Sequence, residues 1–318
     1  MHELHAAAFT TDTNGVNDEA QTAVVGAFQQ LFQRALAVEA ERPVLLEIIR
    51  TPAQKRFFWE SAAPNARQLK ARMASIRQSI VADPKVVADA KACRDLPCPQ
   101  SSDATQPAQN TRALRNLALG LLVTAEGEDE KEGGVWWDEA LALCKGRECM
   151  TDTAAGLTLL AHADGAVGGR RAEGLEAFAN NYANEALVMD KWFLAQATAP
   201  RETTLDEVNA LLSHPQFDRR NPNKMYALVG GFAGANPVGF HMHDDGASYT
   251  WLTDIILDVD ASNPIVAGRL VSTLANWSKF AESDVRRGLL LEQLRRLDAN
   301  ANSMAIRELV SKMLKGTD

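Results

Sequence analysis

Asparagine–proline pairs recur along this chain, and each of them predicts the start of a helix. Asn221-Pro222, Asn236-Pro237 and Asn263-Pro264 place a capping amide directly before a proline. The amide oxygen can accept a hydrogen bond from a free N–H of the first turn, and a proline at the first helical position removes no bond that the helix needs. Asp83-Pro84 and Thr51-Pro52 repeat the pattern. A sequence with so many helix starts predicts many short helices rather than a few long ones.

Between these starts, apolar residues recur at the spacing of an amphipathic helix. Two such stripes are clear, Leu69, Met73, Ile76 and Ile80 after Pro64, and Ile306, Leu309, Val310, Met313 and Leu314 near the end. Asn302 or Ser303 can cap the second helix and Gly316 can end it, and Thr204 with Glu207 has the spacing of a capping box. We find no β-hairpin signal.

Composition favours the same fold class. The chain has 318 residues, of which 46% are hydrophobic and only 6% aromatic. Alanine and leucine dominate the apolar set, and both lose little side-chain freedom in a helix. We therefore predict an all-α protein, an αα-superhelix of stacked short helices that resembles armadillo or HEAT repeats and has no β-sheet, although no fixed sequence period is present.

The domain organisation that we expect is simple. Residues 1–16 form a poorly ordered N-terminal segment, and residues 17–318 form a single α-superhelical domain. Two polar stretches predict surface loops, one near 94–110 and one near 126–134, where acidic residues cluster beside Gly133-Gly134.

Charge and hydropathy exclude several classes of protein. The chain carries 33 basic and 41 acidic residues, a net charge of −8, which argues against a general nucleic-acid binder. No run reaches the roughly 18 apolar residues that span a bilayer, and the first residues do not have the pattern of a secretory signal. We therefore expect no membrane or nucleic-acid partner and a cytoplasmic location.

Two histidine motifs could suggest a metal site. His2-Glu3-Leu4-His5 resembles a zincin motif, but that motif needs its two histidines at i and i+4, and here the second histidine is at i+3 and Ala6 occupies i+4. In the segment from His241 to Asp245, a metalloenzyme would need His241, His243 and Asp245 to converge on a cation. We favour a polar loop for this segment and keep the metal site as the alternative.

Cysteine and glycine patterns give no further catalytic signal. The four cysteines form two C-x4-C pairs, Cys93/Cys98 and Cys144/Cys149, which we interpret as free thiols, with a metal site or disulfide as the alternative. The glycine-rich stretch 229–234 follows a helical segment, so we interpret it as a helix end and a close packing contact rather than a phosphate-binding loop. We predict no catalytic residue and no metal ligand in this chain.

A family resemblance appears in several segments. They are Leu187–Phe193 with Gln196–Thr198, Asn221–Lys224, Phe232–Pro237, Phe240-His241, Asp245-Gly246, and Asn263-Pro264 with Ala267, Arg269 and Leu270; upstream, Arg112–Asn116 and Met150–Asp152 also fit. With these residues the chain resembles the C-terminal helical domain of the bacterial-type aminopeptidase N family, the zinc-dependent gluzincin aminopeptidases. The similarity is specific from about residue 110 to the end and thinner, but in the same order, over 17–110.

The resemblance implies a function for the whole enzyme. Members of the family have an N-terminal β domain, a thermolysin-like zinc domain, a small β sandwich and a final helical domain that encloses the active-site cavity and admits short peptides. It implies that zinc is held in the catalytic domain, which is missing here, and that this chain needs no cofactor. The expected partners are the catalytic and β domains of the parent enzyme and short peptides, in a monomer.

The resemblance also implies which side chains line the cavity. Arg269 matches a cavity-facing arginine, whose planar donors would suit a peptide carbonyl or a C-terminal carboxylate. Tyr226 and Ile265 stand where the family often has a basic residue and a glutamine, and Lys224 replaces an arginine. Trp192 and Phe193 are expected to be core residues. The open alternative is a free-standing helical-repeat module that binds a peptide or a protein.

Overall fold

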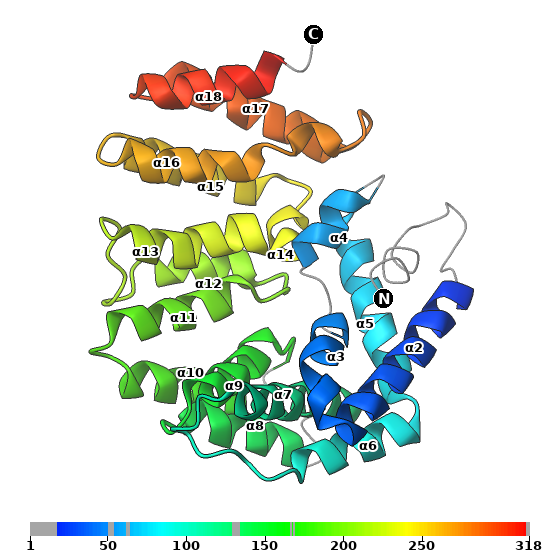
Figure 1. The fold of residues 1–318 in the computed structure, drawn as a ribbon. Helices are drawn as coiled ribbons and strands as arrows, with labels where there is room; N and C mark the ends of the chain where they lie inside the picture. Colours follow the sequence, from blue (N-terminus) through cyan, green and yellow to red (C-terminus); the bar gives the residue numbers. More distant parts are fainter. Residues whose placement is uncertain are drawn as a thin grey trace. The chain divides into compact units, whose positions relative to one another are not determined.

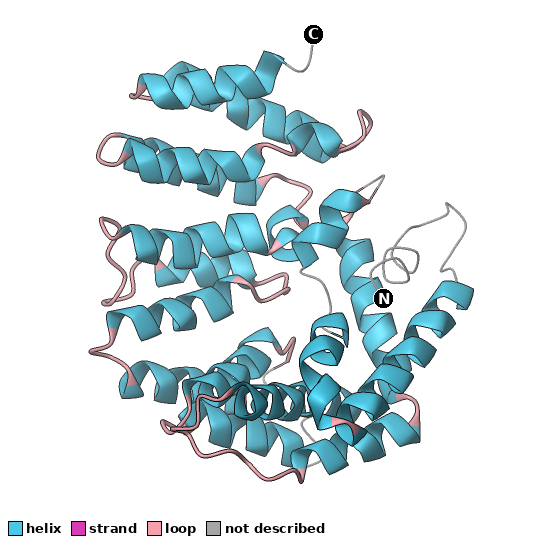
Figure 2. Cartoon of the chain, viewed as in Figure 1, coloured by secondary structure: helices cyan, strands magenta, loops and turns pink. Residues whose placement is uncertain are grey.

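Every regular element that the structure describes is a helix. The computed structural model describes residues 18–49, 54–61, 64–128, 134–165, 167 and 169–315, and within these ranges the chain contains no strand (Figure 2). The prediction of an all-α fold is confirmed. The N-terminal segment 1–16 with its His2–His5 motif, the Thr51-Pro52 pair and Gly316 lie outside the described residues.

The chain divides into two compact units. Unit 1 comprises residues 1–53 and 70–182, and unit 2 comprises residues 54–69 and 183–318. This division does not test the prediction of a single domain over 17–318, which stays a prediction. Unit 1 contains α2 (Asp18–Ala37), η1 (Glu39–Glu41), α3 (Arg42–Ile49), most of α5 (Ala66–Val81), α6 (Pro84–Arg94), α7 (Gln106–Glu126), α8 (Val135–Lys145), α9 (Met150–His162) and α10 (Arg170–Asn181).

Unit 2 is a stack of short helices in two layers. One layer consists of α11, α13, α16 and α18, which follow one another (Figure 1). The π-helix η2 continues α13. Helices α15 and α17 pack against this layer and form the other one. Its elements are α4 (Gln54–Glu60), the start of α5, α11 (Ala186–Ala197), α12 (Thr204–Leu211), α13 (Pro222–Met225), η2 (Tyr226–Ala235), α14 (Pro237–His241), α15 (Ala247–Asp260), α16 (Pro264–Val271), η3 (Ser272–Leu274), η4 (Trp277–Lys279), α17 (Val285–Asn300) and α18 (Met304–Leu314).

The predicted helix starts are present in the described residues. The side chains of Asn221, Asn236, Asn263 and Asp83 each accept a hydrogen bond from a backbone N–H of the first turn that follows. At α18 the cap is Ser303 rather than Asn302, because the Ser303 hydroxyl accepts from the N–H of Ile306. These caps satisfy N–H groups that would otherwise lack a partner.

Two local predictions were wrong. Thr204 does not form a capping box with Glu207: its side chain is buried and its hydroxyl donates to the carbonyl of Ala199, so Thr203, the preceding residue, contacts Glu207 instead. The glycine-rich stretch 229–234 does not end a helix, because it lies within η2, a ten-residue π-helix. The predicted close packing is present, since a Cβ at Gly231 would lie 2.9 Å from Leu194 Cδ1.

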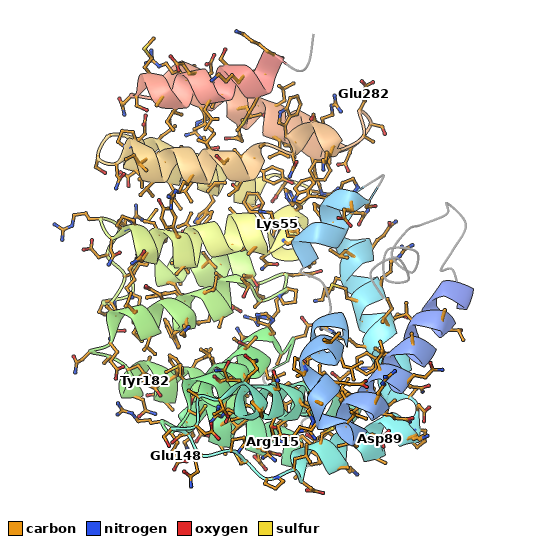
Figure 3. The ribbon with its side chains drawn as sticks, viewed as in Figure 1. Lys55, Asp89, Arg115, Glu148, Tyr182 and Glu282 are labelled. Carbon is orange, nitrogen blue, oxygen red and sulfur yellow. The ribbon has the colours of Figure 1, made fainter. Side chains whose placement is uncertain are left out.

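The two polar stretches join helices of unit 1. Residues 95–105 connect α6 to α7, and arginines of α7 bind the backbone of this loop: Arg112 Nη2 donates to the carbonyl of Asp103 over 2.8 Å, and Arg115, labelled in Figure 3, donates to the carbonyls of Arg94 and Leu96. At the second stretch α7 extends to Glu126, whose carboxylate accepts from the first N–H groups of α8 at Trp136 and Trp137. Residues 129–133 lie outside the described part.

The core residues predicted from the sequence can be compared with the structure. Trp192 and Phe193 are buried in unit 2, as predicted. Among the described helices, none is both long and apolar enough to cross a membrane.

Candidate functional site

Three of the four residues expected to line a cavity come together in unit 2. Ile265 and Arg269 lie one turn apart on α16, so they share a face of that helix, and both are exposed, Ile265 to 75%. Tyr226 is the first residue of η2, which packs on α16. The Arg269 guanidinium carbon lies 5.0 Å from the centre of the Tyr226 ring. This contact brings an aromatic ring and a cation together, and the exposed Ile265 lies on the same face of α16 as the cation.

The stacking of Arg269 on Tyr226 leaves its hydrogen-bond donors available. A cation–π contact uses the face of the guanidinium and not its five N–H groups. Within the part of the chain that the structure describes, no carboxylate forms an ion pair with Arg269. An oriented guanidinium with free donors is suited to a carboxylate or a peptide carbonyl.

Lys224, the fourth residue, is engaged within the fold. Its side chain is buried, and its ammonium lies 2.7 Å from both the Ala186 carbonyl and an oxygen of Asp190, and 5.2 Å from the centre of the Phe193 ring. These contacts connect α13 to α11. Burial and the Lys224 charge also lower the pKa of the neighbouring His214. The part of Lys224 in a cavity lining stays a prediction.

Helix α11 exposes two further apolar side chains that the sequence analysis did not single out. Leu187 is 72% and Leu194 is 42% exposed, and they lie seven residues apart, with the exposed Lys191 between them. The i, i+4, i+7 spacing of these residues is the signal that could have identified this face.

His241 is a buried residue and not part of a polar loop, so that expectation was wrong for this position. It belongs to α14, its Nδ1 lies 2.8 Å from the Tyr249 hydroxyl, and its ring lies parallel to Phe58 at a centroid distance of 5.0 Å. Burial, and then the charge of Arg286, lower the His241 pKa to about 3, so the ring is neutral at physiological pH.

The other polar residues of this segment have separate partners. Asp244 forms ion pairs with Arg67, over 2.7 Å, and with Arg286, while Asp245 accepts from the backbone N–H of Ala247. Among the residues that the structure describes, no group of three or more His, Cys, Asp or Glu side chains is placed to hold a metal ion. The described residues therefore do not fit a zinc ion, and we derive no metal chemistry from them.

The cysteines do not provide an activated nucleophile. Cys93 and Cys144 are buried, and burial raises the pKa of each thiol to about 12. The Cys144 thiol donates to the carbonyl of Gly174 over 3.4 Å. Such thiols stay protonated at neutral pH and are inert. Cys98 is exposed and Cys149 is half-buried, and neither forms a disulfide.

The comparison with known families decides the relationship. Residues 1–315 match a family described as a domain of unknown function, DUF3458_C, with ARM repeats. The chain belongs to this family. ARM repeats are the helical repeats that the stacked layers of unit 2 display, so the family agrees with the predicted superhelix.

Relatives of this DUF3458_C chain include several bacterial aminopeptidases N. It is 42% identical over 167 residues to that of Caulobacter vibrioides, which is 52% of this chain and 18% of the relative. It is 38% identical over 125 residues to the Escherichia coli protein, which is 39% of this chain and 14% of the relative. The matches thus span less than a fifth of these relatives' length, and they confirm the resemblance to the aminopeptidase N family.

A solved structure shows the same fold. The crystal structure of Legionella pneumophila aminopeptidase A in complex with aspartic acid superposes with a TM-score of 0.78, and the match covers 94% of this chain and 36% of that chain. The sequence identity is 22%, so this likeness concerns the fold alone.

Proposed function

We propose that this chain is the helical domain of a zinc-dependent aminopeptidase, which encloses the active-site chamber of the parent enzyme and admits short peptides. The observation that carries the proposal is the DUF3458_C match over residues 1–315, together with relatives that are aminopeptidases N several times longer than the matched region. The catalytic and β domains of the parent are the proposed partners, zinc belongs to the catalytic domain, and the enzyme is a cytoplasmic monomer.

Within this proposal, the surface of Tyr226, Ile265 and Arg269 faces the peptide. Arg269 binds a C-terminal carboxylate, because its N–H donors have no acidic partner within the described residues. The Tyr226 ring stacks on the face of the guanidinium and so orients these donors. Ile265 adds an exposed apolar contact for a neighbouring peptide side chain. The role of this surface is to bind and orient the far end of a short peptide, while the chemistry takes place elsewhere.

The proposal that this chain does not catalyse the reaction by itself has a direct test. The purified chain, supplied with zinc and an aminoacyl fluorogenic substrate, is expected to show no turnover. Turnover that persists through repurification and is abolished by a point mutation within this chain would contradict the proposal.

The Arg269 role predicts a selective loss of peptide binding. In NMR titrations of the purified chain with a short apolar peptide, Arg269→Ala is expected to weaken binding about 10-fold or more, because a charge-assisted hydrogen bond contributes roughly 1.5–3 kcal/mol. The same peptide with a C-terminal amide is expected to bind the wild type and the variant equally.

A matched variant controls for the loss of a surface cation. Arg295 is also an exposed arginine, but it lies on α17 in the other layer of unit 2. Arg295→Ala is expected to leave the affinity for both peptides unchanged. Equal losses for Arg269→Ala and Arg295→Ala, or no preference for the free carboxylate, would refute the assigned role.

A further inference from the structure

Residues 54–69 interrupt the sequence of unit 1 but pack as part of unit 2. They contain α4 (Gln54–Glu60) and the first residues of α5. Figure 1 shows α4 beside α14, and Lys55 marks this helix in Figure 3. A helix of seven residues is too short to be stable by itself in water. The contacts of α4 with unit 2 therefore determine whether it is formed.

Two described side chains of α4 make aromatic contacts. Phe58 is 1% exposed and stacks on His241, and Trp59 lies edge-on to His241 with ring centroids 5.3 Å apart. Both rings also contact Phe280, at centroid distances of 6.0 Å and 5.6 Å. We call the two receiving residues, His241 and Phe280, the aromatic socket; Phe240 and Tyr249 in turn contact the His241 ring.

Two polar contacts of the segment can be described. Lys279 Nζ donates to the carbonyl of Trp59 over 3.1 Å, and Arg67 pairs with Asp244, where the two side chains are 55% and 52% exposed. Exposed ion pairs are screened by water and contribute weakly. Glu60 and Ser61 have polar partners as well, and Phe58 and Trp59 provide the aromatic part of the attachment of α4. A short element attached in this way opens at a lower free energy than the whole unit unfolds.

Phe58 and Trp59 cover the ring of His241, so their departure would expose it to water. The charged and titratable groups that face His241 come from several elements. The Tyr249 hydroxyl of α15 bonds its Nδ1, and Arg286 of α17, which pairs with Asp244 and Asp284, donates to its carbonyl. From η4, Lys279 bonds the backbone of α4, which carries Lys55 and Glu60 as exposed charges. The hydrogen-bond partner of the His241 ring is the Tyr249 hydroxyl. Among the described residues, no carboxylate forms a hydrogen bond with this ring.

We propose that α4 is a strap over the aromatic socket that opens independently of the rest of unit 2, and that acid opens it because His241 takes up a proton only after Phe58 and Trp59 have left its ring. The strap is thus a pH-sensitive conformational element, and this property is separate from the proposed peptidase role.

The size of the effect follows from linkage. The pKa of His241 is about 3 in the closed state, against its ordinary value of 6.5. A base whose pKa is lowered in the closed state stabilises that state fully above about pH 6.5, and this stabilisation is lost as the pH falls toward the lower value. The ratio of open to closed strap is therefore expected to rise by up to about 30-fold from about pH 7.5 to about pH 5, the full value applying if burial accounts for the whole shift, since Arg286 stays beside His241.

Hydrogen exchange of the full chain tests the proposal. Mass spectrometry would follow the amides of residues 54–61 between these two pH values, with rates corrected for intrinsic exchange. We expect these amides to be less protected than those of α15 at neutral pH and to lose protection by up to about 30-fold at the acidic end. Protection equal to that of α15 at both pH values, or no dependence on pH, would overturn the proposal.

Two variants separate the titration of His241 from its hydrogen bond. His241→Phe keeps an aromatic ring against Phe58 but cannot be protonated, so the pH dependence of the strap is expected to disappear. Tyr249→Phe removes the same 2.8 Å hydrogen bond but keeps the histidine, so the pH dependence is expected to persist. A pH dependence that survives in His241→Phe would refute the role of this residue. If a variant does not fold, the pH profile of the wild-type strap still tests the proposal.

Discussion

Replacing Gly156 by alanine is expected to destabilise the chain by about 3 kcal/mol or more, at the upper end of the cost of overpacking. Gly156 lies on α9 and faces α8. An added Cβ would lie 2.4 Å from the carbonyl oxygen of Ala140, 2.7 Å from the backbone nitrogen of Cys144 and 3.0 Å from Leu143 Cβ. Two of these atoms belong to the backbone of α8 and cannot rotate away, so the two helices would have to separate.

Urea unfolding followed by circular dichroism measures this effect, and Gly288→Ala is the matched control. Gly288 lies within α17, and nothing lies within 4 Å of a Cβ built on it. This control is expected to stabilise the chain by about 0.5–1 kcal/mol, because alanine has the higher helix propensity. A Gly156→Ala variant as stable as wild type would show that α8 and α9 do not pack as closely as described.

Replacing Asn236 by alanine is expected to cost about 3 kcal/mol or more, because one buried amide connects two helices. Its Nδ2 donates to the carbonyls of Ala197 and Ala199 over 3.0 Å and 2.7 Å, and its Oδ1 accepts from the N–H of Gly239 over 2.9 Å. The side chain is fully buried. Truncation leaves the Gly239 N–H and the Ala197 carbonyl buried without this partner, while the Ala199 carbonyl keeps the donors of Thr204 and Arg201.

The aspartate variant separates the two functions of this amide. Asn236→Asp keeps the cap on Gly239 but loses both donors to the carbonyls. Its carboxyl would be buried beside two carbonyl oxygens, so its pKa is expected to be raised, and the variant should lose further stability as the pH rises through this pKa. Urea unfolding of the variant at several pH values would detect this dependence.

Asn221→Ala provides the matched control for the cap alone. Asn221 also precedes a proline and accepts from the N–H of Asn223 over 2.9 Å, but it is only half-buried. Its loss is expected to cost about 1 kcal/mol, the usual contribution of an N-cap. Equal losses for Asn221→Ala and Asn236→Ala would show that the contacts of Asn236 with α11 contribute nothing.

The candidate surface was only partly accessible to sequence reasoning. Arg269, Tyr226, Ile265 and Lys224 were selected through a family resemblance, and the first three lie together in the described structure. The sequence did not reveal that Lys224 is buried and bonded to Asp190, because that pairing joins α13 to α11 across the packed unit. Their role toward peptides remains our proposal.

Local patterns determined the class of this fold. The Asn-Pro pairs at 221, 236 and 263 predicted helix starts correctly, because an N-cap and its partners lie within three residues of each other. Helical spacing and composition were then enough to predict stacked helices without a sheet.

Only the tertiary structure decided what those residues do beyond their own helix. Asn236 also bonds the carbonyls of Ala197 and Ala199, His241 is buried under Phe58, and Gly156 touches the backbone of α8. Each of these contacts joins residues far apart in the chain, and their partners are set by how the helices pack rather than by the spacing of residues within one helix.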